Sequence, residues 1–163
     1  MGVRSANISD IKAMSYIHAR TWKKAYIDYI SREYLNNIPD DGWVPLFTRA
    51  FNENIHEAAV FETEGIITGT VTFGRGSFID EGEIISLYVL PQFWSTGQGY
   101  QLTKFAVEGL KEQGFKSCYL WVIKENKRAV SFYKKFGFES TGELTTVMLA
   151  GLPVIEEKYR IYL

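Results

Sequence analysis

The chain has 163 residues, of which 46% are hydrophobic and 23% are charged, an ordinary composition for a globular domain large enough to bury a core. Its 18 Lys and Arg side chains against 19 Asp and Glu leave a net charge of −1, which argues against non-specific nucleic-acid binding, because that binding needs a basic surface. The single cysteine excludes an intrachain disulfide, and with no signal peptide and no apolar run of roughly 18 residues, a cytoplasmic protein without a membrane partner is expected.

The first part of the chain predicts a short strand followed by a helix. Val3 to Ala6 fits an edge strand. Asn7 or Ser9 can cap the helix, because a short polar side chain there accepts a hydrogen bond from the first helical N–H groups. Apolar residues recur at near-helical spacing from Ile11 to Trp22, which indicates one buried helix face.

Two shorter helices are predicted next. Ser31 is a good cap for the first of them, which should end near Pro39. Asp40 or Asp41 can cap the other, whose apolar residues continue to Ala50. No repeat or linker interrupts this part of the chain, so a single domain over residues 1–163 is expected.

From residue 58 onward the pattern changes to strands. Residues 59–61 and 66–73 predict a hairpin whose turn is Glu64-Gly65. Residues 83–89 predict a third strand, apolar enough to be central, which Pro91 ends because proline cannot donate to a strand ladder.

The last part of the chain alternates helices and strands. The predicted helices span residues 99–113 and 127–136, with Gly114 and Gly137 as stops. The predicted strands span residues 118–123, 138–150 and 154–163, with a turn at residues 151–153 between the last two. This mixture of elements indicates a mixed α/β sheet.

The loop between the strand ending at Val89 and the helix starting at Gly99 has the features of a phosphate site. It carries Gly97 and Gly99, and a long helix follows at once. Helix N-terminal N–H groups attract anions, and glycines let the backbone come close to phosphate oxygens. The loop lacks the third glycine of a dinucleotide fingerprint and the Gly-Lys-Ser/Thr of a P-loop, and taken alone it is more often a plain turn at a helix start.

A second motif, later in the chain, strengthens the interpretation of the glycine loop as a phosphate site. It has the form Asn-x-x-Ala-x-x-Phe-Tyr followed by Gly-Phe, and it runs from Asn126 to Phe138. In this order the two motifs resemble motifs A and B of the GCN5-related N-acetyltransferase (GNAT) family, most closely from Ile66 to Phe138. One position departs from that family's pattern, because Trp94 stands where the loop motif has Arg or Gln.

The resemblance implies a fold, a cosubstrate and a reaction. The fold is a mixed α/β domain with a central, mostly antiparallel sheet of about seven strands, splayed open in the middle and flanked by helices. The reaction is direct transfer of an acetyl group from acetyl-coenzyme A (acetyl-CoA) to an amine, without a metal. The residues that the resemblance assigns to the cofactor are Leu87, Tyr88, Val89, Trp94, Ser95, Thr96, Gly97, Gln98, Gly99, Tyr100, Asn126, Arg128 and Tyr133. For Arg128, which shares its phosphate role with Lys134, a solvated basic face is the alternative.

Two side chains are the candidate catalytic groups. Acetyl transfer needs a neutral amine, a stabilised carbonyl oxygen and a proton for the departing thiolate. The resemblance places Tyr133 near the cofactor sulfur as proton donor, with Asn126 on the same helical face; a tyrosine that only packs is the alternative. Glu83 stands where the histone-acetylating branch carries its base, with Glu81 as a fallback and a solvated or lysine-paired carboxylate as the alternative.

The acceptor site is expected near the first helix. Trp22, Tyr26 and Tyr29 lie at and after its end, where this fold builds the acceptor pocket together with Glu83, and aromatic walls suit an ammonium group or an apolar acceptor. Core packing is the alternative for these aromatics. The expected acceptor is a primary amine of a small molecule; a protein or peptide amine, or a non-catalytic acetyl-CoA sensor, stays open, as does a homodimer.

The remaining reactive residue types are expected to be structural. Cys118 lies inside a predicted strand, with no histidine near it in sequence to activate a thiolate. His18 and His56 have no metal-ligand spacing to one another or to other ligating residues, so no metal site is predicted.

Overall fold

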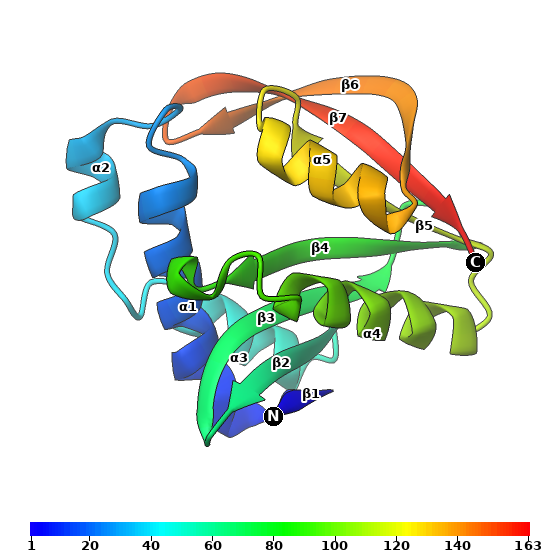
Figure 1. The fold of residues 1–163 in the computed structure, drawn as a ribbon, viewed down its shortest axis with the longest axis horizontal. Helices are drawn as coiled ribbons and strands as arrows, with labels where there is room; N and C mark the ends of the chain where they lie inside the picture. Colours follow the sequence, from blue (N-terminus) through cyan, green and yellow to red (C-terminus); the bar gives the residue numbers. More distant parts are fainter.

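The fold is built on a seven-stranded sheet in the order β1-β2-β3-β4-β5-β7-β6 (Figure 1). The computed structural model describes residues 1–163. Neighbouring strands are antiparallel except β4 and β5, which run parallel, so the expected mostly antiparallel, mixed α/β fold is confirmed. The strands are β1 (Gly2–Ser5), β2 (Glu57–Thr63), β3 (Ile66–Arg75), β4 (Glu81–Val89), β5 (Ser117–Ile123), β6 (Glu139–Leu149) and β7 (Leu152–Tyr162).

Helices cover both faces of the sheet, and side-chain alternation along β2 shows how. Ala59 and Phe61 join the core beneath α4, whereas Ala58 and Val60 pack with α1 and α3 on the other face. Helix α5 lies over β5 and β7 on the same face as α4 (Figure 1). No helix is both long and apolar enough to cross a membrane. The helices are α1 (Ile11–Ala25), α2 (Arg32–Asn36), α3 (Val44–Asn52), α4 (Gln98–Glu112) and α5 (Lys127–Phe136).

The predicted helix caps are partly right. The Asn7 side chain accepts from the Ser9 N–H at 2.9 Å and starts a one-turn 3₁₀ helix that leads into α1, and Ser31 accepts from the Tyr34 N–H at 3.2 Å to start α2. The expected aspartate cap of α3 is wrong. Trp43 occupies the cap position with no side-chain cap bond, and a proline lies in the first turn, where its missing N–H is not needed.

The two tight hairpins, β2–β3 and β6–β7, turn through two residues with positive φ. Glu64 and Gly65 (φ of 52° and 78°) join β2 to β3, as predicted. Between β6 and β7 the turn is Ala150-Gly151 (φ of 51° and 80°), so the predicted turn at residues 151–153 starts one residue late. The sheet continues through Leu152 and Pro153, because a proline is tolerated at the start of a strand.

Strands β4 and β5 pair at one end only and then part (Figure 1). Their ladder joins Glu81–Glu83 to Ser117–Tyr119 and stops there, although β4 continues to Val89. On the other side of β4, the Leu90 N–H donates to the Thr68 carbonyl at 2.9 Å. Because backbone groups of an antiparallel ladder alternate in direction, Leu87 and Val89 turn theirs away from β3, toward the gap that β5 has left.

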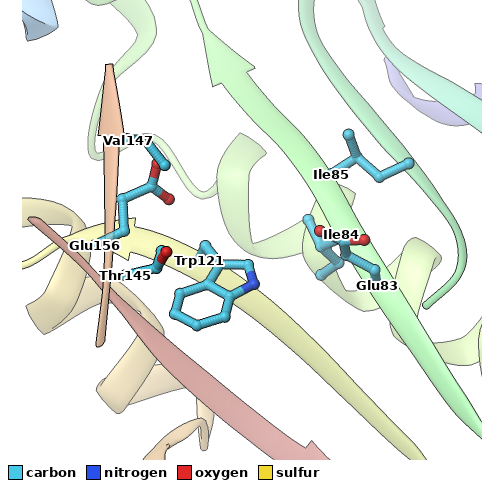
Figure 2. A pocket seen from close by; sticks show the side chains of 7 residues that line it. All are labelled: Glu83, Ile84, Ile85, Trp121, Thr145, Val147 and Glu156. Carbon is cyan, nitrogen blue, oxygen red and sulfur yellow. The ribbon is translucent and has the colours of Figure 1, made fainter. Parts of the chain in front are cut away.

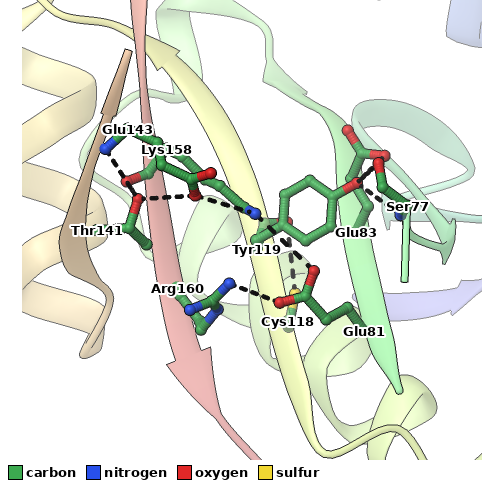
Figure 3. A network of polar contacts seen from close by, with 9 residues as sticks. All are labelled: Ser77, Glu81, Glu83, Cys118, Tyr119, Thr141, Glu143, Lys158 and Arg160. Carbon is green, nitrogen blue, oxygen red and sulfur yellow. Dashed lines mark hydrogen bonds and ion pairs between the residues drawn. The ribbon is translucent and has the colours of Figure 1, made fainter. Parts of the chain in front are cut away.

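A partly buried ionic network joins the strands at the end where β4 and β5 still pair (Figure 3). Glu81 of β4 accepts from Arg160 of β7 at 2.6 Å and lies 3.9 Å from the ammonium of Lys158. Lys158 also contacts Glu143 of β6 at 3.2 Å and lies over the ring of Tyr119 of β5 at 4.5 Å. One end of the sheet is therefore clamped while the other end diverges.

Candidate active site

The N-terminus of α4 lies at the open end of the gap between β4 and β5, and no side chain caps its backbone N–H groups. Gly97, the N-cap residue, has φ of 87° and Ser95 has φ of 64°, so the loop uses two left-handed residues to turn into the helix. No side chain caps the first N–H groups of α4, its first turn carries no acidic residue, and a Cβ added at Gly97 would meet no atom within 4 Å. This arrangement fits a phosphate group on the helix start.

The side chain of Gln98 is not part of that surface. It is buried, and its oxygen accepts from the hydroxyl of Thr68 on β3 at 2.8 Å. Only the backbone N–H of Gln98 can therefore meet an anion. Thr96 is similarly engaged, because its hydroxyl donates to the Phe93 carbonyl at 2.6 Å, whereas Tyr100 is exposed on the first turn of α4 and packs on Phe136 of α5.

Trp94 joins the loop to the strand end and to α5. Its indole N–H donates to the Val89 carbonyl at 2.7 Å, and the guanidinium of Arg128 lies over the indole at 3.7 Å. The hydroxyl of Thr21 in α1 also donates to the Val89 carbonyl, at 3.3 Å. The Val89 carbonyl is therefore occupied. Of the backbone groups of Leu87 and Val89 that point away from β3, the Val89 N–H and both groups of Leu87 remain available to a ligand. The sequence showed that a tryptophan replaces the family's Arg or Gln at this position. It did not predict that the indole would contact the Val89 carbonyl and Arg128.

Tyr133 of α5 lies in the gap with its hydroxyl free of hydrogen bonds within the chain. Its ring packs edge-on against Phe132 and Phe138, at centroid distances of 5.2 and 5.8 Å. Burial, with smaller contributions from Tyr88 and Cys118, raises the pKa of Tyr133 well above its ordinary value. The phenol therefore keeps its proton at neutral pH.

Asn126 lies at the start of the same helix but is engaged differently. Its side-chain oxygen accepts from the Ala129 N–H at 3.2 Å and caps α5. The side-chain amide N–H₂ group has no partner in the chain and is the part of Asn126 that a ligand can use. Sequence spacing placed Asn126 and Tyr133 on one helical face, and the cap explains why an asparagine suits the first of these positions.

The aromatic residues of the first helix gather around Tyr88 of β4. The Tyr88 hydroxyl accepts from the Trp22 indole N–H at 3.1 Å and lies 3.2 Å from the Tyr26 hydroxyl. Tyr29 lies at the edge of this group, 6.4 Å from the Tyr26 ring. Burial is the largest cause that raises the pKa of Tyr26 and of Tyr88, and it outweighs the hydrogen bonds with Tyr26 and Trp22 that lower the pKa of Tyr88, so both hydroxyls stay neutral.

Glu83 lines a cavity on the sheet face opposite α4 (Figure 2). A Cβ at the adjacent Gly82 would lie 2.6 Å from Leu110 of α4, so residue 83 points to the other face. Its carboxylate accepts from the Tyr119 hydroxyl at 3.1 Å, and burial raises its pKa despite that bond and the nearby Lys158. The cavity holds about 370 Å³ and is lined by Glu83, Ile84, Ile85, Trp121, Thr145, Val147 and Glu156.

Among these lining residues only Glu83 was predicted from the sequence, and Trp121 and Glu156 are two that sequence reasoning missed. Trp121 of β5 places its indole between Glu83 and Glu156 (Figure 2), and Glu156 of β7 faces the same cavity without a hydrogen bond or ion pair in the chain. Burial, and then the charge of Glu83, raises the pKa of Glu156. The alternation of Glu156 and Lys158 along one strand face was the available signal, but it does not say which strand lies beside β7.

Glu81, the fallback base, faces the ionic network rather than the cavity: Arg160 donates to one of its carboxylate oxygens, and the Lys158 ammonium lies 3.9 Å from the other. Cys118 is buried in β5, where burial raises the pKa of its thiol to about 12 and disfavours the thiolate. His18 lies buried among aromatic rings, and burial lowers its pKa to about 3. No group of three or more His, Cys, Asp or Glu side chains is arranged to hold a metal ion.

Comparison with known proteins agrees with this architecture. The sequence model of the acetyltransferase (GNAT) family matches residues 13–138. An uncharacterized N-acetyltransferase of Bacillus subtilis, YuaI, is 28% identical over 149 residues, which cover 86% of this chain and 82% of that protein. Spermidine N(1)-acetyltransferase of Thermoplasma acidophilum is 23% identical over 145 residues, which cover 84% of this chain and 87% of that protein.

Solved structures share the fold over nearly the whole chain. A ribosomal-protein-alanine N-acetyltransferase from Brucella melitensis has a TM-score of 0.79 at 19% identity, with 100% of each chain covered. The PaiA N-acetyltransferase of Thermoplasma acidophilum, solved in complex with coenzyme A, has a TM-score of 0.72 at 21% identity, with 95% of this chain and 96% of that chain covered. At these identities the likeness shows the fold.

The family match spans most of the chain, and the parted strands lie within it. The chain therefore belongs to the acetyltransferase (GNAT) family. It is an N-acetyltransferase, as the sequence motifs predicted, and family membership brings with it acetyl-CoA as the acetyl donor.

Proposed function

We propose that the protein transfers an acetyl group directly from acetyl-CoA to a primary amine of a small molecule. The observation that carries the proposal is the parting of β4 and β5. One side of this gap holds the bare N-terminus of α4 and the other holds a cavity with two carboxylates. A thioester and an amine can therefore enter from opposite faces of the sheet and meet between the two strands.

The donor side is assigned to the loop and to the edge of β4. The N–H groups of Gln98, Gly99 and Tyr100 would hold the phosphates, because nothing in the chain caps them. Leu87 and the Val89 N–H would bond the amide-bearing arm as a strand would, because their groups point into the gap. The remaining cofactor residues frame this path: Tyr88, Trp94, Ser95, Thr96, Gly97, Asn126 and Arg128.

The chemistry is assigned to two side chains of this chain. Acetyl-CoA supplies the thioester when it is bound. Glu83, whose pKa is raised by burial, takes a proton from the acceptor ammonium through water, so that a neutral amine reaches the carbonyl carbon. The Leu87 N–H is an outward backbone donor for the carbonyl oxygen, and the Tyr133 phenol gives its proton to the departing sulfur.

Two observations favour a small acceptor over a protein. The cavity of about 370 Å³ is bounded by side chains of four strands, β4 to β7, and has the size of a small-molecule site. Trp22 and Tyr26, expected at the acceptor site, bond to Tyr88 of β4 and form an aromatic cluster that suits a small ammonium-bearing or apolar acceptor. The spermidine acetyltransferase among the relatives supports the same class, whereas the ribosomal-protein-alanine acetyltransferase among the fold neighbours represents the alternative.

The test is a thiol-release assay with acetyl-CoA against small amines, polyamines and peptides with free N-termini or lysines. Faster release with small amines than with peptides is the expected result. Glu83→Gln should lower turnover at neutral pH about a hundredfold, whereas Glu57→Gln at the start of β2, outside the gap, should leave it unchanged. Release confined to peptides would establish the protein acceptor, and no release with any acceptor would point to a non-catalytic sensor.

A further inference from the structure

The cavity and the ionic network beside it hold more negative than positive charge. Four carboxylates lie there, those of Glu81, Glu83, Glu143 and Glu156, and the cationic side chains in contact with them are Lys158 and Arg160. Both cations already have carboxylate partners. Arg160 and Lys158 form ion pairs with Glu81, and Lys158 also forms one with Glu143 (Figure 3). The two carboxylates that remain, Glu83 and Glu156, both line the cavity.

These two carboxylates have little compensation within the chain. Glu83 accepts one hydrogen bond, from Tyr119, and feels Lys158 only as a neighbouring charge. Glu156 has no hydrogen bond or ion pair at all. Half-buried carboxylates that face one another across a cavity repel, and a cation placed between them relieves that repulsion.

The wall between them suits an ammonium group with an alkyl chain. Trp121 presents its indole between Glu83 and Glu156, and Ile84, Ile85 and Val147 supply apolar lining (Figure 2). An indole face attracts a cation, and the aliphatic side chains fit methylene groups. The cavity therefore combines two anionic ends with an apolar middle.

We propose that the acceptor carries at least two amino groups, and that Glu156 holds the one that is not acetylated. The reacting amine gives its proton toward Glu83, while a second ammonium stays charged between Glu156 and the Trp121 indole. Glu156 is then a specificity-determining residue that selects diamines and polyamines over monoamines of equal length. This inference rests on the proposed function, because it concerns the acceptor of the same reaction.

The experiment compares diaminobutane with butylamine, which replaces one ammonium by a methyl group at the same chain length. In the wild-type protein kcat/KM should be at least about tenfold higher for diaminobutane, since a charge-assisted contact is worth about that factor. Glu156→Gln should raise the KM for diaminobutane about tenfold, with little change in kcat, and leave butylamine unaffected. Circular dichroism establishes that the variant is folded.

Glu157→Gln is the matched control, because this neighbouring glutamate points to the other face of β7 and bonds to Ser140. It should change neither amine's kinetics. Equal kcat/KM for the two amines, or equal effects of Glu156→Gln on both, would overturn the inference while leaving acetyl transfer in place.

A binding measurement separates failure of the inference from failure of the proposed function. Calorimetric titration of diaminobutane into the protein without acetyl-CoA should give heat with the wild type and much weaker binding with Glu156→Gln. Binding that depends on Glu156 without thiol release would count against the proposed catalysis but support the diamine site. Thiol release with peptides and no diamine binding would overturn the inference alone.

Discussion

Tyr133 and Tyr119 are both tyrosines, but their hydroxyl groups differ in their hydrogen-bond partners. The Tyr119 hydroxyl bonds to Ser77 and donates to Glu83, so it is fully occupied in fixing that carboxylate. The Tyr133 hydroxyl has no partner in the chain and lies between the parted strands, near Tyr88 and Cys118. At the scale of the single residue, a free phenol in the gap is what distinguishes a candidate proton donor from a packed tyrosine.

Tyr133→Phe should therefore lower kcat about a hundredfold while leaving the affinity for acetyl-CoA nearly unchanged, since it removes a proton and little packing. Steady-state thiol release and calorimetric titration of coenzyme A measure the two quantities. Tyr159→Phe is the control, because it removes a hydroxyl from a buried core tyrosine. Turnover of Tyr133→Phe equal to wild type would refute the donor role.

Two glutamates should respond to pH with opposite signs. Burial raises the pKa of Glu156 above the ordinary 4.5, so its contribution to stability is lost as pH rises through that region. Glu156→Gln should then gain urea resistance over wild type at about pH 8 and show no gain at about pH 4. Lys158 lowers the pKa of Glu143, so Glu143→Gln should lose resistance at about pH 8 and recover it near pH 3. The same sign for both variants would contradict this assignment.

At the scale of elements, α4 begins and ends on glycines of the same conformation. Gly97 precedes the helix with φ of 87°, and Gly114 follows it with φ of 89°. A Cβ at either position would meet no atom within 4 Å. A side chain at either glycine would therefore cause similar backbone strain and no steric clash. Only Gly97, at the start of the helix, lies at the proposed phosphate site.

Gly97→Ala and Gly114→Ala should each cost about 1 kcal/mol of stability, because both put an alanine in the left-handed region. Only Gly97→Ala should also weaken coenzyme A binding, by about tenfold, because the loop amides shift away from the phosphates. Urea unfolding and calorimetry measure the two effects. Equal loss of coenzyme A affinity in both variants would show that α4 acts only through its stability.

At the scale of the whole molecule, the gap lies at one end of strands that an ionic network joins at the other end. Lys158 is buried between Glu81 and Glu143 and lies over Tyr119, which links β4, β5, β6 and β7 (Figure 3). Beyond this network β4 and β5 no longer pair. One end of these strands therefore carries the contacts that stabilise the sheet, and the other end forms the open site.

Lys158→Met should destabilise the protein by about 2 kcal/mol, less than the roughly 3 to 5 kcal/mol typical of a broken buried pair, because Arg160 continues to neutralise Glu81. Lys104→Met, which breaks an exposed 3.7 Å contact with Glu108 on α4, should cost at most about 0.5 kcal/mol. Urea unfolding of both variants measures the difference. Equal small losses would show that the network contributes no net stability.

Much of the fold followed from local pattern. The Glu64-Gly65 turn, the bounds of α5 and the stop after β4 are set by residues that are neighbours in sequence, so turn chemistry and periodicity predicted them. The α3 cap and the turn before β7 were misplaced. In both cases several nearby residues can fill the role, and packing selects one of them.

The sequence by itself determined the family, because the glycine loop and the Asn126 to Phe138 motif each keep their chemistry within one short segment. Only the tertiary structure decided which residues line the proposed acceptor cavity. Glu156 and Trp121 reach the cavity because β7 pairs with β5 while β4 departs from it, and Trp94 meets Arg128 across the gap. Contacts between strands far apart in sequence depend on the order of the sheet, which side-chain alternation along a single strand does not encode.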